Sequence, residues 1–250
     1  MKNPNYSYIG ITFILLVFGI IFIPKIVNRI KHGDITRTES RSKNLNLNEV
    51  TNTISLSNLI INGEKKKVPT FNFINQNGKT ITNEDYNGKV FLLEFFFTTC
   101  PTICPKMNQN LVSLQNSFPN RSDFGIASIT INPNYDTVEV LKDYADQYGV
   151  TNPNWHFLTG DQEIIYELAN SGFNLYAAQV DGAAGGFEHS GNFALIDKSG
   201  YIRSRLDDFG NPKIYYKGTI SQLEQVNDEG EFEEISDLKE DILKLLNEYN

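Results

Sequence analysis

Residues 88–97, which read GKVFLLEFFF, restrict the fold of this chain more than any other stretch. From residue 90 onward the run is apolar except for Glu94, and it is rich in aromatic and branched side chains. Such a continuous run is typical of a strand that is buried on both faces of a sheet. The run therefore predicts a central strand in a sheet that helices flank.

Strand-like and helix-like segments alternate through the following residues. Apolar periodicity and turn residues predict, in order, a hairpin at 68–82, the central strand, a helix at 101–116, a strand at 124–131, a helix at 137–149, a strand at 155–160, a helix at 161–172, a hairpin at 191–206 and a helix at 235–249. Thr137 and Asp161 are the expected N-caps. A leading hairpin, two βα units, a hairpin and a closing helix predict an α/β fold with a mixed sheet.

The closing helix is predicted to be amphipathic. Its apolar face carries Ile235, Leu238, Ile242, Leu245 and Leu246. The acidic residues 216–234, just before it, do not fit the alternating pattern. We expect them to form an excursion from the fold.

The N-terminal residues predict a membrane anchor. Residues 8–23 carry no charge. A membrane-spanning helix needs ~20 apolar residues, and the stretch reaches that length if it extends to Val27. The Lys25 side chain would then extend to the membrane–water interface. A cleaved signal peptide is the alternative, but no small-x-small site follows the apolar core. The expected division of the chain is a tail at 1–7, an anchor at 8–27, a polar tether at 28–64 and a domain at 65–250.

Charge constrains the partners and the orientation. The net charge is −8 and the pI is about 5.0, which argues against nucleic acid because phosphate binding needs a clustered basic face. Lys65, Lys66 and Lys67 are expected to lie in a solvated turn. Basic residues are more frequent after the anchor than before it, so the positive-inside rule taken alone would place the domain in the cytoplasm.

Both cysteines of the chain lie in CPTICP, residues 100–105. The motif stands where the central strand is predicted to end and a helix to begin, the edge at which open α/β sheets bind ligands. A helix N-terminus stabilises thiolate. With residues 101–116 helical, Cys100 and Cys104 lie one turn apart on one face, and Pro105 fits the first turn.

Two thiols in this arrangement can bind a soft metal or cycle between dithiol and disulfide. Helical spacing of ~6 Å permits oxidation, whereas a structural disulfide across so small a loop would add little stability. A tetrahedral structural zinc site needs four ligands, while copper(I) accepts thiolate and low coordination. Three histidines could complete a site: His32 beside the anchor, His156 on a short strand, and His189 in a Gly-rich loop before a strand.

The chain resembles the SCO/SenC family of thioredoxin-like proteins. The segments that carry the resemblance follow the family order across roughly residues 65–205: GKVFLLEFFFTTCPTICPKMNQNL, ITINPNYDTVEVLKDYADQYGV, WHFLTG and EHSGNFALIDKSG. The resemblance implies a copper site formed by Cys100, Cys104 and His189, which binds Cu(I), with Cu(II) left open. It also implies a metallochaperone that delivers copper to the CuA centre of cytochrome c oxidase subunit II.

The resemblance implies a location and further partners as well. The domain would lie on the extracytoplasmic, periplasmic side of a bacterial inner membrane, although the positive-inside rule taken alone predicts the opposite side. It would receive copper from an upstream donor or electrons from a thiol reductant. This chain departs from the family at Asn132 and Glu188, where acidic Asp residues are usual, but it keeps Asp136. Residues 216–234 resemble a lineage-specific insertion.

The alternative function is a thiol–disulfide oxidoreductase that keeps the CuA-site cysteines of the target reduced. In that role Cys100 would attack and Cys104 would resolve the mixed disulfide. A peroxidase is a third and weaker hypothesis, and a classical enzyme is not expected. His189 separates the first two functions, because a three-ligand copper site needs it and dithiol exchange does not.

Overall fold

The computed structural model describes residues 15–18, 56–207 and 209–248. By contact the chain divides into two units, Met1–Ile54 and Ser55–Asn250. In the first unit residues 15–18 are helical, and the rest of the anchor predicted at 8–27 lies outside the described residues. Within the described ranges, no helix combines the length and the apolar character needed to cross a membrane.

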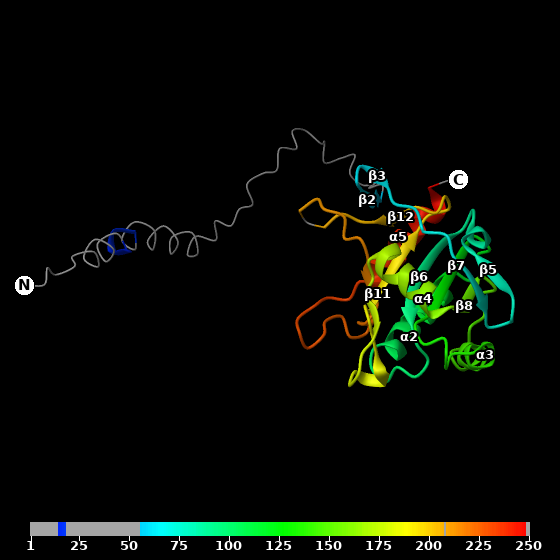
Figure 1. Cartoon of the computed structure of the whole chain (residues 1–250). Helices are drawn as coiled ribbons and strands as arrows, with labels where there is room; N and C mark the ends of the chain where they lie inside the picture. Colours follow the sequence, from blue (N-terminus) through cyan, green and yellow to red (C-terminus); the bar gives the residue numbers. More distant parts are fainter. Residues whose placement is uncertain (1–14, 19–55, 208, 249–250) are drawn as a thin grey trace, which may run out of the picture. The chain divides into compact units, whose positions relative to one another are not determined.

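The second unit is built on a mixed sheet (Figure 1). The described residues form a nine-stranded sheet with the order β1-β12-β11-β6-β7-β8-β4-β5, and β13 pairs with β11. Three central strands are parallel: β6 (Val90–Phe96), β7 (Phe124–Thr130) and β8 (Trp155–Thr159). The remaining neighbours in the sheet are antiparallel. The predicted mixed sheet is therefore confirmed.

The other strands close the two sides of the sheet or form separate ribbons. The antiparallel strands of the sheet are β1 (Ser57–Asn58), β4 (Asn72–Asn75), β5 (Thr80–Thr82), β11 (Asn192–Ile196), β12 (Ile202–Ser204) and β13 (Tyr216–Lys217). Two ribbons stand apart, β2 (Ile60–Ile61) with β3 (Glu64–Lys65), and β9 (Ala177–Gln179) with β10 (Phe187–His189).

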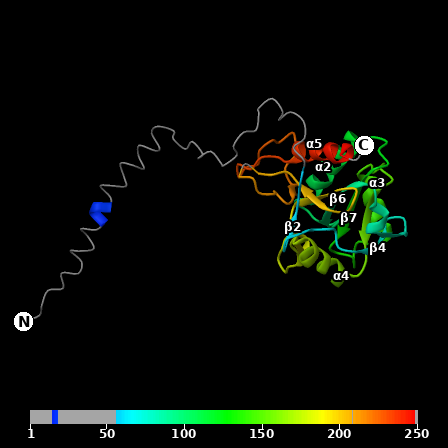
Figure 2. The ribbon, with the colours of Figure 1, turned by 90° about the horizontal axis from the view of Figure 1, so that it is seen from above.

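Helices flank the sheet on both sides. They are α2 (Cys104–Ser117), α3 (Val138–Gln147), α4 (Gln162–Glu167) and α5 (Ile235–Asn247), with a π-helical turn at Leu168–Phe173 and short 3-10 turns at Asn83–Tyr86 and Ala184–Gly186. Figure 2 shows α2 and α5 together on one side of the sheet and α4 on the other. The predicted α/β layering is thus the observed one.

Strand β6 is the centre of the core, and all seven of its residues are buried. Successive side chains point to opposite faces. Phe95 accordingly meets Phe173 after α4 at 6.1 Å between ring centroids, whereas Phe96 meets Tyr144 of α3 at 5.6 Å. Each such aromatic side chain contributes about 1.5–3 kcal/mol by leaving water. This two-sided burial is the reason for the continuous apolar run in the sequence.

The predicted helix signals are confirmed. The Thr137 side chain accepts a hydrogen bond from the Val140 N–H, and Asp161 accepts from the N–H groups of Glu163 and Ile164. In α5, the five residues predicted to form the apolar face are all fully buried: Ile235, Leu238, Ile242, Leu245 and Leu246. One difference lies after α4, which ends at Glu167 and continues as the π-helical turn.

Two polar segments are more ordered in the fold than their sequences suggest. Leu56 and Leu59, within the tether expected at 28–64, are buried in the core. The excursion expected at 216–234 begins as strand β13, and Ile220 beyond it is also buried. A short bridge between Val226 and Phe232 then closes a loop on the surface.

Candidate metal centre

Cys100 lies in the turn between β6 and α2. Its N–H donates to the Phe97 carbonyl at 3.2 Å, and α2 begins only at Cys104. The helix predicted from residue 101 therefore starts three residues too early. The two thiols meet across the turn and not along one helix face.

A buried carboxyl group fixes the start of this turn. Asp136 accepts the Thr98 N–H at 3.1 Å and the hydroxyls of Thr98 and Thr130. Burial raises the pKa of Asp136, although the hydrogen bonds from the two threonines oppose this. Asp136 thus links the residues before Cys100 to the end of β7. The sequence singled out this residue without assigning it a role.

Cys104 is held at the first position of α2. Asn108, one turn further on, donates one amide hydrogen to the Cys104 carbonyl at 3.0 Å and is 3.1 Å from the Tyr144 hydroxyl. Pro105 stands in the first turn as predicted, where its missing N–H costs nothing. The Cys104 side chain is fully buried. Both cysteines are free thiols.

His189 reaches the thiols from the β9–β10 ribbon. It lies on β10 opposite Ala177, so it sits on a paired strand and not in the flexible loop that the sequence suggested. Its Nε2 is 3.1 Å from Cys104 Sγ, and its Nδ1 is 3.1 Å from the Ser190 carbonyl. The ring also packs edge-on against Phe97, with centroids 5.9 Å apart.

The sequence analysis missed this ribbon. Its available signal was Asp181-Gly182, a turn dipeptide between two short runs, 177–180 and 187–189. The loop between the strands is long and rich in glycine, which weakens that signal. The ribbon is also the element that sets the position of His189.

The structure brings together all three residues that the resemblance implied as ligands. The ligand atoms of Cys100, Cys104 and His189 lie within 4.8 Å of one another. His156 instead sits on β8, where its Nδ1 is 3.2 Å from the Asn75 side chain. His32 lies outside the described residues. Two thiols and one imidazole form a soft donor set that suits copper(I), and they are too few for a closed structural zinc site.

The two thiols differ in acidity. A hydrogen bond from the Cys104 side chain lowers the pKa of Cys100 to about 3, against the opposing effect of burial. The same hydrogen bond and burial raise the pKa of Cys104. Cys100 is therefore the thiolate of the pair at neutral pH. Cys104 is the protonated and more enclosed partner.

A second buried carboxyl group lies behind the thiols. Glu94, on β6, accepts a hydrogen bond from Ser128 at 2.8 Å, and its other oxygen has no hydrogen-bond partner among the described residues. Burial raises the pKa of Glu94 to about 8, so it is mostly protonated at neutral pH. A negative charge on Glu94 would raise the pKa of Cys104 further.

An apolar hollow of about 340 Å³ opens beside the thiols. Its lining includes the side chains of Cys100 and His189, and aromatic and aliphatic residues form much of the rest: Phe97, Ile103, Tyr176 and Phe187. A group from another molecule can reach Cys100 and His189 through it. Cys104 is not part of this lining.

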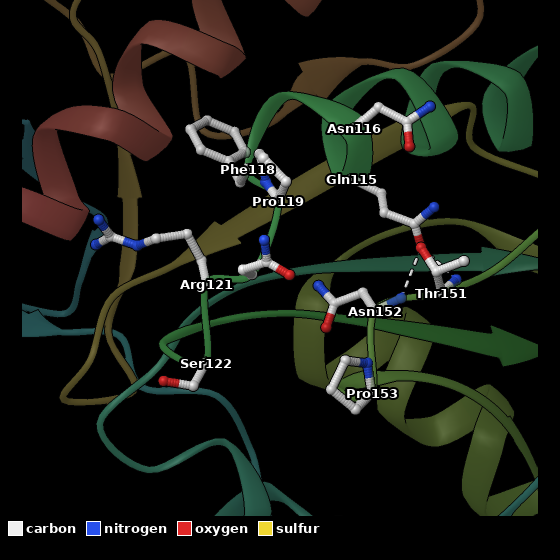
Figure 3. Close-up of a pocket in the computed structure, with 10 residues that line it drawn as sticks. Gln115, Asn116, Phe118, Pro119, Arg121, Ser122, Thr151, Asn152 and Pro153 are labelled. Carbon is white, nitrogen blue, oxygen red and sulfur yellow. Dashed lines mark hydrogen bonds between the residues drawn. The ribbon is translucent and has the colours of Figure 1, made fainter.

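A different, more polar cavity of about 450 Å³ lies at the far end of α2 (Figure 3). One of its polar side chains, that of Gln115, already has internal partners. The Gln115 Oε1 accepts the N–H groups of Thr151 and Asn152, both at 2.9 Å. These bonds join α2 to the loop before β8. We therefore assign this cavity a structural role.

Comparison with known proteins places this chain in one family. The sequence profile of the SCO1/SenC family matches residues 61–224. The SCO1 protein homolog of Bacillus subtilis (strain 168) is 34% identical over 164 residues, which cover 64% of this chain and 83% of that protein.

Solved structures agree. A SCO1/SenC family lipoprotein from Bacillus anthracis is 28% identical with a TM-score of 0.59, covering 72% of this chain and 95% of that chain. BsSco, described as a Sco-family cytochrome c oxidase assembly protein with a disulfide switch, is 28% identical with a TM-score of 0.57, covering 72% and 94%. Two more distant structures that share the fold, at 24% and 22% identity, hold copper.

The fold is of the thioredoxin type, a mixed sheet flanked by helices with a dithiol at a strand-to-helix turn. In this chain a third potential metal-binding group, the imidazole of His189, lies beside the two thiols. The family match covers more than half of the chain. This chain belongs to the SCO1/SenC family.

Proposed function

We propose that this protein is a copper metallochaperone that binds copper through Cys100, Cys104 and His189. The observation that carries the proposal is the meeting of two thiol sulfurs and one imidazole within 4.8 Å of one another. Copper(I) prefers soft thiolate ligands and accepts three ligands. Copper in solved relatives with this fold supports the choice of metal.

The chain's own groups prepare the site for the metal. Cys100 is already a thiolate at neutral pH, whereas Cys104 must lose its proton when copper binds. The Ser190 carbonyl can accept a hydrogen from Nδ1 of His189, which leaves Nε2 free to bind the metal. The hollow beside Cys100 and His189 gives an acceptor's ligands a route for exchange. Release would then begin with replacement of Cys100 and His189 and end when Cys104 gives up the metal and takes back its proton.

The acceptor and the location are part of the same proposal. The acceptor is the CuA site of cytochrome c oxidase subunit II, which fits the description of BsSco as an oxidase assembly protein. Residues 8–27 anchor the chain in a bacterial inner membrane, and the domain faces the periplasmic side. The lipoprotein among the relatives supports an attachment to the membrane.

The test compares copper affinity in matched histidine variants. Cu(I) is titrated against a chromophoric chelator under anaerobic conditions with the parent protein, His189→Ala and His156→Ala. Loss of a residue that hydrogen-bonds to a metal ligand lowers metal affinity about 10–100-fold, so loss of the ligand itself should lower it at least about a hundredfold. We expect that loss for His189→Ala and parent affinity for His156→Ala, whose ring contacts Asn75 and Tyr86. Parent-like affinity in His189→Ala would refute the ligand assignment.

Thiol–disulfide exchange is the second candidate, and the lowered pKa of Cys100 favours it. The Cys100 thiolate would attack a target disulfide, form a mixed disulfide and release one target thiolate. Cys104 would then give up its proton and displace the second target thiolate, leaving a Cys100–Cys104 disulfide. The two electrons pass to the target, and an external thiol reductant must restore the pair. His189→Ala should retain this exchange while it loses copper.

A further inference from the structure

The β2–β3 ribbon carries apolar side chains that the core does not use. Among the residues that the structure describes, its two strands pair only with each other, and Asn62 and Gly63 form the turn between them, both with positive φ. Ile60 is 51% exposed and Ile61 is 45% exposed. Ile60 lies opposite Lys65 and therefore shares its face, while Ile61 lies on the reverse face. The tip of the ribbon thus presents an isoleucine on each face.

Two lysines and a tyrosine continue this surface. The ammonium groups of Lys65 and Lys67 lie 5.7 Å and 4.9 Å from the centre of the Tyr201 ring. A backbone bridge between Lys67 and Tyr201 holds the ribbon to the start of β12. We call Ile60, Ile61, Lys65, Lys67 and Tyr201 the hairpin patch. The expected solvated turn at 65–67 is instead an ordered edge of the domain.

The charge of this region is opposite to that of the whole chain. Between residues 56 and 82 there are four lysines and one acidic residue, Glu64, although the chain carries −8 overall. Protein surfaces that lie at a membrane interface typically combine lysines with aromatic and aliphatic side chains. Anionic lipid headgroups attract such lysines, and the isoleucines can enter the headgroup region.

We propose that the hairpin patch docks the domain onto an anionic lipid surface. The positive charge of the patch is complementary to anionic lipid headgroups. The position of the patch in the sequence, after the apolar N-terminal residues, favours a membrane as the surface. The patch follows the apolar residues 8–27 after a polar stretch. The proposal rests on the membrane anchor proposed above for residues 8–27, and it does not depend on the copper site.

Docking at this patch also sets the direction of the thiols. The patch adjoins the β11–β12 turn, because the Val68 N–H donates to the Gly200 carbonyl at 2.9 Å. The same turn contacts the residues that precede β6, where the Gly88 N–H donates to the Lys198 carbonyl at 3.0 Å. Strand β6 then runs for seven residues, about 23 Å, to the turn that holds Cys100. The docked domain would direct its thiols away from the lipid.

The test measures sedimentation with vesicles. Residues 55–250 form a compact unit that contains its own hydrophobic core, so this fragment can be used without the apolar N-terminus. It is mixed with vesicles of phosphatidylcholine alone, or of phosphatidylcholine with phosphatidylglycerol, at about 0.1 M and about 0.5 M salt, conditions that change the screening of surface charges. We expect binding to the phosphatidylglycerol vesicles only, and loss of that binding at high salt.

Matched variants locate the binding surface. Each lysine near an anionic surface strengthens binding about fivefold, so Lys65→Gln with Lys67→Gln should weaken binding on the order of tenfold or more. Lys142→Gln with Lys239→Gln makes the same change in net charge on exposed helix positions and should leave binding unchanged. Ile60→Ser with Ile61→Ser should also weaken binding. The urea unfolding midpoint should stay near the parent value in every variant, which shows that each one folds.

Three results would overturn the proposal. The first is an absence of sedimentation with phosphatidylglycerol vesicles. The second is equal binding to both kinds of vesicle. The third is an equal loss of binding in the Lys65/Lys67 and Lys142/Lys239 variants, which would attribute the effect to net charge and not to the patch.

Discussion

Glu94 is a carboxyl group in the middle of the most buried strand. The strand pattern predicted its burial, because it interrupts an otherwise apolar run. Its protonation could not be predicted from sequence, since that depends on the contacts that the fold places around it. One Glu94 oxygen accepts from Ser128 of the next strand, and the other has no hydrogen-bond partner among the described residues. A neutral acid is the form that such a site tolerates.

The Glu94→Gln variant tests this state through the pH dependence of stability. The folded pKa is raised from the ordinary 4.5 to about 8. The stability that this group contributes is therefore fully present below the ordinary pKa and is lost as the pH rises from there through about 8, because the unfolded chain ionises Glu94 while the folded protein keeps it neutral. The loss should reach a few kcal/mol, on the order of 1.4 kcal/mol for each unit of pKa shift.

Urea unfolding across the range from mildly acidic to mildly alkaline pH provides the measurement. Glutamine resembles the neutral acid, so the variant should lack this fall in unfolding free energy and should exceed the parent in stability above the folded pKa of Glu94. Parallel curves for parent and variant would show that Glu94 is not held neutral in the fold.

At the scale of elements, the β9–β10 ribbon completes the proposed metal site, because it holds His189 next to the two thiols. The strand-to-helix turn alone marked the cysteines as functional, and the family resemblance implied that they are ligands. The position of His189 could not, because a contact between distant segments fixes it. Gly185, with φ of +75°, lies against the β6–α2 turn, and a Cβ there would come within 2.7 Å of the Phe97 ring. The start of the turn before Cys100 depends in the same way on a distant contact, between Asp136 and Thr98.

Gly185→Ala should therefore separate His189 from the thiols. The added methyl group collides with Phe97 and displaces the ribbon, so we expect copper affinity to fall by about tenfold or more, and stability to fall by about 1–3 kcal/mol from overpacking in addition to backbone strain. The chelator titration used for the histidine variants measures the affinity, and urea unfolding measures the stability.

Gly186→Ala is the matched control. Gly186 also has a positive φ, +83°, but no atom lies within 4 Å of the position that an added methyl group would take. This variant should lose about 1 kcal/mol of stability from strain and keep its copper affinity. Equal copper affinity in the two variants would mean that the contact with Phe97 does not position His189.

For the whole molecule, local periodicity was enough to predict the order of strands and helices. Strand β6 and helix α5 could be predicted because each has one continuous apolar surface. Short elements that owe their form to neighbours were not, and they include β1, β13 and the two ribbons. The anchor at 8–27 stays a prediction, since most of it lies outside the described residues.

Copper should stabilise the folded domain, because its three ligands converge only in the folded chain. A ligand present at about a hundred times its Kd adds about 2.7 kcal/mol, which corresponds to a rise in Tm of about 5–10 °C for a domain of this size. Thermal unfolding under anaerobic conditions with and without Cu(I) measures the rise. It should be clearly smaller for His189→Ala, and an unchanged Tm in the parent would contradict copper binding by the folded site.

X-ray absorption at the copper edge tests the central claim most directly, because it counts the atoms bound to the metal. For the Cu(I)-loaded parent we predict two sulfurs and one nitrogen, and for His189→Ala the loss of the nitrogen with both sulfurs retained. A parent spectrum with sulfur ligands alone, or one that the His189→Ala substitution leaves unchanged, would contradict the site formed by Cys100, Cys104 and His189.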